Sequence, residues 1–353
     1  MTYGDEAVGS LYCPPNIDAL TGLSGRSKGV YGKRAVAALV FAFAASLVST
    51  GQALAVACTQ TGFSRDNINL TAALINPGDV TGTVDATGCN IGIYYGPGSK
   101  AKVTDADVFG ANYFGIVNNG GDIDVKNSSV HNIGEDPFNG TQHGVGIYFV
   151  DGGTGSIHKN TVSLYQKGGI VVNAVGSSAK IQNNTVTGLG RVDFIAQNGI
   201  QVSRGATGDV SNNTVSGNAY TGANGASSGG ILIYGGCGDP LTTGVDVKNN
   251  TLVNNDVGIF LFNGDLACEG APATPTNNSA HNNTISNDMV SNISGFGPGC
   301  GYQAGVDDVG NGDEITNNSI SGAGYATHEC PAFVRPIDTT QAIDPTVRNN
   351  RIS

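Results

Sequence analysis

The sequence predicts an all-β solenoid: a coil of short parallel strands, three to a turn, with a ladder of asparagines at one corner. Two short phrases that alternate along the chain support this fold class, together with a composition poor in helix formers. Among 353 residues there are 54 Gly, no Trp and 2 Met, and 13% of the residues are charged. Helix-rich domains carry Glu, Lys and Arg on their surfaces, so short strands joined by tight turns fit this composition better.

The first phrase is a glycine followed by Ile or Val, and it opens a short apolar strand. It occurs at Gly115, Gly146, Gly169, Gly199, Gly230, Gly258 and Gly305. The second phrase is an Asn pair followed by Thr or Ser and an aliphatic residue, as in "NNTV" from Asn183. The spacing from glycine to aliphatic residue is nearly constant (Gly146 to Val162, Gly199 to Val215), whereas the return to the next glycine varies between coils. Fixed strands with variable returns define a solenoid.

One coil shows how three strands arise. The segments "GIVV", "KIQ" and "TVT" between Gly169 and Thr187 are expected to be its strands, with Ile170, Val172 and Ile181 pointing inward together with Val186. Each coil then presents the same apolar set to the next coil, about 4.8 Å away. The predicted core is a column of aliphatic side chains.

The Asn phrase is expected to form the corner between two strands. Asn tolerates unusual backbone angles, and its amide can bond both the backbone and the equivalent Asn of the next coil. Read as motifs, "NNT" and "NNS" are also glycosylation sequons. Because they recur with the period of the coil, ladder formation explains them without a sugar.

On these two phrases the chain resembles the right-handed parallel β-helix superfamily, which includes pectate lyases and related polysaccharide lyases, hydrolases and epimerases. The resemblance covers residues 80–353, and residues 58–79 are expected to form an N-terminal cap. It implies the fold strongly. It says little about the activity, because the same fold hosts many functions.

The N-terminal region has the layout of a secretory signal. Lys33 and Arg34 precede an apolar run from Ala35 to Val48, which is followed by small residues. We therefore expect residues 1–57 to be a leader and signal peptide, and the protein to be secreted. An uncleaved membrane anchor is the minority alternative, since the run is shorter than the roughly 20 residues of a spanning helix.

The cysteines fit a secreted chain. Cys13 lies in the leader, which leaves six cysteines whose neighbours are about one coil apart. Residues stacked in adjacent coils lie near the separation that a disulfide needs. The predicted disulfides are Cys58–Cys89, Cys237–Cys268 and Cys300–Cys330. A zinc site is the alternative, but the sequence has no C-x-x-C motif.

Three classes of function remain open: a secreted lyase or hydrolase that acts on or binds polysaccharide, a non-catalytic cell-surface or envelope protein, and a structural piece of something larger. The resemblance favours the first. The polygalacturonase and alginate epimerase motifs are incomplete, with only "QHGVG" and "GEDPFNG" present.

Calcium would be a cofactor if the protein were a lyase, and no metal site is predicted. A net charge of −11 disfavours nucleic acid and, after signal cleavage, membrane surfaces. We expect a monomer whose partner is a polysaccharide or cell-wall glycan.

The variable returns are where a site is expected, because consecutive returns stack side by side. Asp136 and Asp193 are candidate acids or bases, and Lys167 and Arg191 could neutralise a substrate carboxylate. The predicted catalytic residues are Asp136, His143, Lys167, Arg191 and Asp193. The predicted substrate-binding residues are Tyr148, Gln197, Asn198, Gln201 and Tyr220. We expect Asp136→Ala and Asp193→Ala each to abolish or greatly weaken polysaccharide activity or binding, and Asp256→Ala to be silent.

Overall fold

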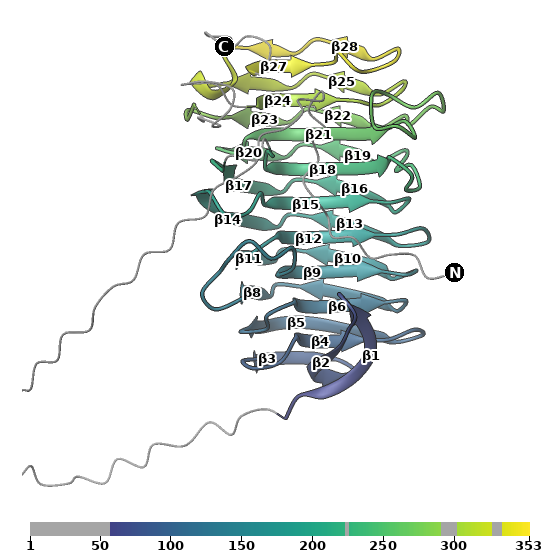
Figure 1. The fold of residues 1–353 in the computed structure, drawn as a ribbon, viewed down its shortest axis with the longest axis vertical. Helices are drawn as coiled ribbons and strands as arrows, with labels where there is room; N and C mark the ends of the chain where they lie inside the picture. The colour runs from purple at the N-terminus through teal and green to yellow at the C-terminus, as the bar shows by residue number, and fades with distance from the viewer. Residues whose placement is uncertain (1–56, 223–225, 291–301, 327–333) are drawn as a thin grey trace, which may run out of the picture. The chain divides into compact units, whose positions relative to one another are not determined.

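The computed structural model describes residues 57–222, 226–290, 302–326 and 334–353. The predicted disulfide Cys300–Cys330 and nearly all of the predicted leader lie outside these residues. From Phe114 onward, each coil consists of three strands in the order that the sequence predicts. All strand pairs are parallel except the first, so the described chain is a parallel β-helix (Figure 1).

One strand of each coil belongs to an 11-stranded sheet, here called sheet A. Its strands are β1 (Thr59–Arg65), β2 (Ile68–Ile75), β4 (Ile91–Tyr95), β6 (Phe114–Asn119), β9 (Val145–Val150), β12 (Gly168–Asn173), β15 (Asn198–Ser203), β18 (Gly229–Gly236), β21 (Val257–Gly264), β24 (Gln303–Asp308) and β27 (Val334–Asp338). β1 and β2 form an antiparallel hairpin, and β2 then pairs in parallel with β4. Each predicted Gly-Ile or Gly-Val phrase lies in a strand of this sheet.

The other strands form an 18-stranded sheet, sheet B, which bends at the Asn corner. One row comprises β7 (Asp122–Lys126), β10 (Thr154–His158), β13 (Ser178–Gln182), β16 (Thr207–Ser211), β19 (Asp246–Lys248), β22 (Ser279–His281), β25 (Glu314–Thr316) and β28 (Thr346–Arg348). The next row comprises β8 (Ser129–Ile133), β11 (Thr161–Tyr165), β14 (Thr185–Val192), β17 (Thr214–Tyr220), β20 (Thr251–Val253), β23 (Thr284–Ser286), β26 (Ser319–Ser321) and β29 (Arg351–Ile352). β3 (Val80–Asp85) and β5 (Lys100–Phe109) begin the sheet, and the 3-10 helix η1 (Ala323–Tyr325) follows β26.

The core is the predicted column of aliphatic side chains. The residue after each phrase glycine pairs in register with its equivalent in the next coil, and all are fully buried: Ile116, Ile147, Ile170, Ile200, Ile231, Ile259 and Val306. The glycine is needed because a Cβ at Gly169 would lie 2.5 Å from the Gly199 carbonyl oxygen and 2.5 Å from Val186. The phrase therefore marks close packing between coils.

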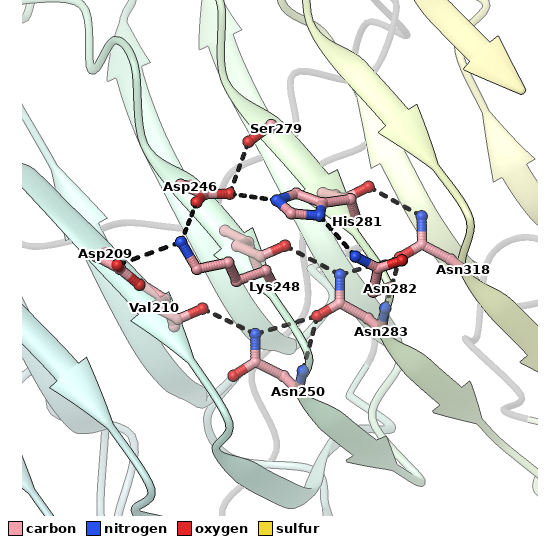
Figure 2. A network of polar contacts seen from close by, with 12 residues as sticks. Asp209, Val210, Asp246, Lys248, Asn250, Ser279, His281, Asn282, Asn283 and Asn318 are labelled. Carbon is pink, nitrogen blue, oxygen red and sulfur yellow. Dashed lines mark hydrogen bonds and ion pairs between the residues drawn. The ribbon is translucent and has the colours of Figure 1, made fainter.

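The predicted Asn ladder is confirmed. In each step one Asn donates from Nδ2 to Oδ1 of the next, and the ladder runs through Asn160, Asn184, Asn213, Asn250, Asn283, Asn318 and Asn350. Figure 2 shows the part from Asn250 to Asn318, beside a surface network of Asp209, Lys248, Asp246 and His281. Only the second Asn of each pair joins the ladder. The first, such as Asn212 with φ 56°, is exposed and makes the left-handed turn.

Two predicted disulfides are confirmed. Cys58–Cys89 and Cys237–Cys268 join neighbouring coils, with Cα atoms 5.4 Å and 4.8 Å apart. The first ties the start of the hairpin to the residues before β4, and the second ties the loop after β18 to the loop after β21.

Two buried carboxyl groups, Asp308 and Asp313, lie together near the start of β25. Asp313 accepts hydrogen bonds from Thr276 Oγ1 at 2.6 Å and from the backbone N–H of Asn278 at 2.7 Å. Asp308 Oδ2 has no donor among the described residues, so a proton on it can be donated to Asp313. Burial and then the charge of Asp313 raise the pKa of Asp308 to about 7.

Stability is therefore expected to fall as the pH rises. The folded protein holds a proton that the unfolded chain releases near pH 4, so this contribution is complete below pH ~4 and is lost by about pH 7. The free energy of unfolding should drop by up to about 1.4 kcal/mol per pH unit in this window for such a group. In chemical denaturation at pH 5 and 7.5, Asp308→Asn should reduce the pH dependence, whereas the exposed control Asp122→Asn should not. An unchanged slope in Asp308→Asn would exclude the shared proton.

Candidate functional site

A pocket of about 80 Å³ lies on the outward face of sheet A, over β9, β12 and β15. Tyr148, Val171 and Gln201 pair in register across these strands and form its floor. The turn of the β1–β2 hairpin contributes Arg65 and Asp66. The remaining lining residues are Tyr113, Phe114, Gln142, His143, Val145, Lys167, Gly168 and Arg204. The space suits a group the size of a carboxylate or a few waters rather than a whole sugar ring.

The hairpin is held against this face by aromatic packing. Phe63 of β1 lies 5.9 Å from Tyr94 and 6.2 Å from Phe114 between ring centroids, and Phe114 stacks on Tyr148 at 4.8 Å. These residues form an apolar cluster outside the main core. The hairpin thereby brings its turn to the edge of the pocket.

The loop between β8 and β9, residues 134–144, forms one wall and is fixed by Gln166. The Gln166 side chain is fully buried. Its Oε1 accepts hydrogen bonds from the backbone N–H groups of Glu135 and Asn139, at 3.1 Å each. Its Nε2 donates to the Thr141 carbonyl at 2.8 Å. Gly144 has φ 90°, and a Cβ there would lie 2.6 Å from Gln166. The loop is therefore a rigid part of the site.

His143 is positioned by this loop. Its ring stacks on Tyr113 at 3.8 Å, and its Nε2 lies 2.6 Å from Glu135 Oε1. Its Nδ1 lies 4.0 Å from Asp66 Oδ2. Burial, followed by the charge of Asp66, raises the pKa of the Tyr113 hydroxyl. The His143 imidazole, with Glu135 as its carboxylate partner, therefore lines the pocket.

Lys167 is a buried cation on the pocket wall. Its side chain is 7% exposed, and its Nζ donates to the Ala196 carbonyl at 2.8 Å. Within the described ranges, no carboxylate lies within salt-bridge distance of this ammonium. Burial lowers its pKa to about 8. An ammonium in this position is stabilised by an anion that enters the pocket.

Two arginines, Arg65 and Arg204, line the pocket. Arg65 Nη2 donates to the Tyr148 hydroxyl at 2.6 Å, and its guanidinium lies 5.4 Å from the Tyr148 ring centroid. Arg204 pairs with Asp239 at 2.8 Å. Burial raises the pKa of Tyr148, so its hydroxyl stays protonated. The pocket lining thus contains three cationic side chains, Arg65, Lys167 and Arg204, beside one carboxylate, Asp66.

A chain of polar side chains crosses the floor. Asn198 donates to Gln201 at 3.1 Å, Gln201 to Ser203 at 2.9 Å, and Ser203 to Asn173 at 2.9 Å. Asn173 then donates to the Tyr148 hydroxyl at 3.1 Å. These hydrogen bonds fix the orientation of the Gln201 amide and the Tyr148 hydroxyl at the pocket.

Gln166→Leu is expected to loosen the loop without unfolding the coil. The substitution removes the acceptor for two amides and should cost about 1–3 kcal/mol locally. Amide hydrogen exchange at Glu135 and Asn139 should quicken markedly, while exchange in β12 and β15 should not. Gln182→Leu, on β13, is the matched control and should leave the loop protected. Unchanged exchange in Gln166→Leu would show that other contacts hold the loop.

The structure divides the predicted site residues into groups. His143, Lys167, Tyr148 and Gln201 line the pocket, and Asn198 supports Gln201. Asp136 lines a separate cavity on the other side of the loop.

The remaining predicted residues lie elsewhere. Arg191 and Asp193 are exposed, and Arg191 donates to the Val290 carbonyl. The Gln197 amide is fully buried and bonded to backbone groups at Tyr165 and Leu189. Tyr220 is buried and does not line the pocket.

The expectation that Asp256→Ala is silent is not supported. The Asp256 carboxylate is 1% exposed and accepts from the Tyr220 amide at 2.7 Å and from the Ser228 amide at 3.2 Å. Its removal would leave buried donors without partners, which is destabilising.

Sequence reasoning missed Arg65, Asp66 and Tyr113 as pocket residues. The signal for Tyr113 is its position just before the phrase glycine Gly115, where the chain enters sheet A. Arg65 and Asp66 give a weaker signal, a charged turn between two short apolar segments.

Across the described residues, no three or more His, Cys, Asp or Glu side chains are grouped so that they could hold a metal ion. In the same residues, no helix has the length and apolar character needed to cross a membrane.

Comparison with known proteins agrees with this geometry. Residues 79–244 match the family model described as Right handed beta helix region. With the parallel three-strand coils, this identifies the fold as a right-handed parallel β-helix and confirms the resemblance seen in the sequence.

One solved structure and no curated protein sequence match the chain. The crystal structure of the Dettilon tailspike protein (gp208) is similar with a TM-score of 0.48 and 16% identity, over 78% of this chain and 55% of that one. The chain therefore spans about half the length of that protein.

Proposed function

We propose that the protein is exported and binds an acidic polysaccharide, with a uronate carboxylate seated against Lys167. The observation that carries this proposal is the buried Lys167, which lines the pocket and whose ammonium has no carboxylate partner among the described residues. Arg65 and Arg204 are two further cationic residues in the pocket lining, and Arg204 is paired with Asp239. The two disulfides support export, since disulfides persist in oxidising compartments.

The aromatic and amide groups of the pocket suit a sugar polymer. Tyr113, Phe114 and Tyr148 offer ring faces or edges, and the Gln201 amide offers hydrogen bonds. Because the pocket admits only a small group, the sugar ring would lie across its mouth with the carboxylate inside. Pockets of this kind take most of their specificity from a few placed polar groups.

Titration with an oligouronate and with the same oligomer after reduction of its carboxyl groups tests the proposal. A charge-assisted hydrogen bond contributes about 1.5–3 kcal/mol, so the reduced oligomer should bind about 10- to 100-fold more weakly. Binding to the oligouronate should also weaken with salt. Equal affinity for the two oligomers would contradict the proposal.

Cleavage of the same polymer by β-elimination is a second candidate function, favoured by the pairing of His143 with Glu135 at 2.6 Å. Neutralisation of the uronate carboxylate would acidify the adjacent ring proton, and a basic group would remove it. The electron pair forms the ring double bond as the glycosidic oxygen leaves and takes up a proton. Appearance of ultraviolet-absorbing unsaturated products would show this reaction, and its absence would leave binding as the function.

A further inference from the structure

A second cavity, of about 650 Å³, lies on the other side of the 134–144 loop. It is bounded by the β3–β4 connection, the β5–β6 connection and the loop itself. Its volume falls within the range of roughly 300–1,000 Å³ that is usual for small-molecule sites, so it can hold a sugar ring. Asp136, which the sequence singled out, lies here and not in the Lys167 pocket.

The walls combine ring faces with unused polar groups. Phe109 and Phe138 line the cavity, and the Phe109 ring is supported by stacking on His131 at 5.3 Å. Asn132 and Asp136 are exposed, and their side chains make no hydrogen bond or ion pair with any other described residue. Aromatic rings beside free amide and carboxylate groups are suited to a sugar with both apolar and polar faces.

The charge of this cavity is opposite to that of the Lys167 pocket. Its lining contains Glu135 and Asp136 and no Lys, Arg or His. Glu135 also contacts His143 of the first pocket at 2.6 Å, so the two sites adjoin through this residue. A uronate would be repelled from the second cavity, whereas a cation would be attracted.

We propose that the cavity beside Asp136 binds a positively charged amino sugar, and hence that the glycan carries an amino sugar near its uronate. The ammonium is placed at the Asp136 and Glu135 carboxylates, and the ring lies against Phe138 and Phe109. The second part of this proposal rests on the proposed function, because it assumes that a uronate occupies the Lys167 pocket. The first part concerns the cavity alone.

The test is calorimetric titration of the full chain with a glucosamine oligomer carrying free amines and with its fully N-acetylated form. The free-amine oligomer should bind at least about tenfold more tightly, because only it carries the charge that the carboxylates attract. Asp136→Asn should remove this preference, and Phe138→Leu should weaken binding of both oligomers. The exposed Asp122→Asn, on β7 and outside both cavities, is the matched control and should have no effect.

The outcomes separate the two proposals. Equal affinity for the two oligomers, retention of the preference in Asp136→Asn, or no binding of either oligomer would overturn the amino-sugar site. Lys167→Met should leave glucosamine binding unchanged while it weakens uronate binding by about 10- to 100-fold. If glucosamine binds through Asp136 but no uronate binds at Lys167, the cavity assignment stands and the proposed function fails.

Discussion

Lys167→Met should lower the affinity for an acidic oligosaccharide by about 10- to 100-fold, which corresponds to the loss of one charge-assisted hydrogen bond. Methionine keeps most of the length and apolar surface of the side chain, so the pocket wall is preserved. The melting temperature should stay the same or rise, because a buried ammonium that costs desolvation energy is removed. Isothermal titration and thermal unfolding of the two proteins measure both effects.

The parent protein should show a matching pH dependence. The ammonium is the form that attracts a carboxylate, and burial has lowered the pKa of Lys167 to about 8. Affinity should therefore be constant between pH 6 and 7 and fall towards tenfold per pH unit above pH 8, where an ordinary lysine would still be charged.

Lys180→Met is the matched control for both experiments. Lys180 lies on β13 and is exposed away from the pocket, so its loss should change neither affinity nor pH dependence. If Lys167→Met kept the parent affinity, the carboxylate would have to bind elsewhere.

Asn213→Leu should destabilise the β-helix by several kcal/mol, the largest stability effect that we expect from one side chain. Asn213 Oδ1 accepts hydrogen bonds from the backbone N–H and from the side-chain Nδ2 of Asn184. Asn213 Nδ2 donates to the Ile181 carbonyl and to Asn250 Oδ1. Leucine satisfies none of these groups, and each buried group left unpaired costs about 1–3 kcal/mol.

Asn212→Gly, one residue earlier, is the control for the ladder variant. Asn212 is exposed with φ 56°, a conformation that glycine adopts without strain, so its replacement should change the free energy of unfolding by less than about 0.5 kcal/mol. Comparable destabilisation by the two variants would mean that the turn, and not the ladder, carries the stability.

The fold could be predicted from the sequence because every coil repeats the same packing problem. Gly169 is required by the close approach of the next coil, Ile170 by the core column and Asn184 by the ladder. Each of these residue types therefore recurs in the sequence with the period of the coil. The sequence explanation of the sequons needed refinement: the ladder uses Asn184, while the sequon residue Asn183 is exposed at the turn.

The site was only partly predictable because it depends on interactions outside this period. Loop lengths placed Asp136, His143 and Lys167 near one another, but they do not say which side of the loop each side chain faces. Arg65 and Asp66 reach the pocket through an antiparallel hairpin that packs on sheet A. The repeat pattern of the parallel coils does not predict the position of this hairpin. Direct contact between Gln166 and the loop backbone was equally invisible in the sequence.

Nuclear magnetic resonance of the chain with its lysines methylated using ¹³C-formaldehyde would report on Lys167 directly. The pKa of the Lys167 signal, about 8 in the free protein, should rise by more than about one unit when an oligouronate binds, because a carboxylate beside the amine favours its charged form. The signal of Lys180 should not change. An unshifted Lys167 pKa at saturating oligouronate would contradict the placement of the carboxylate in this pocket.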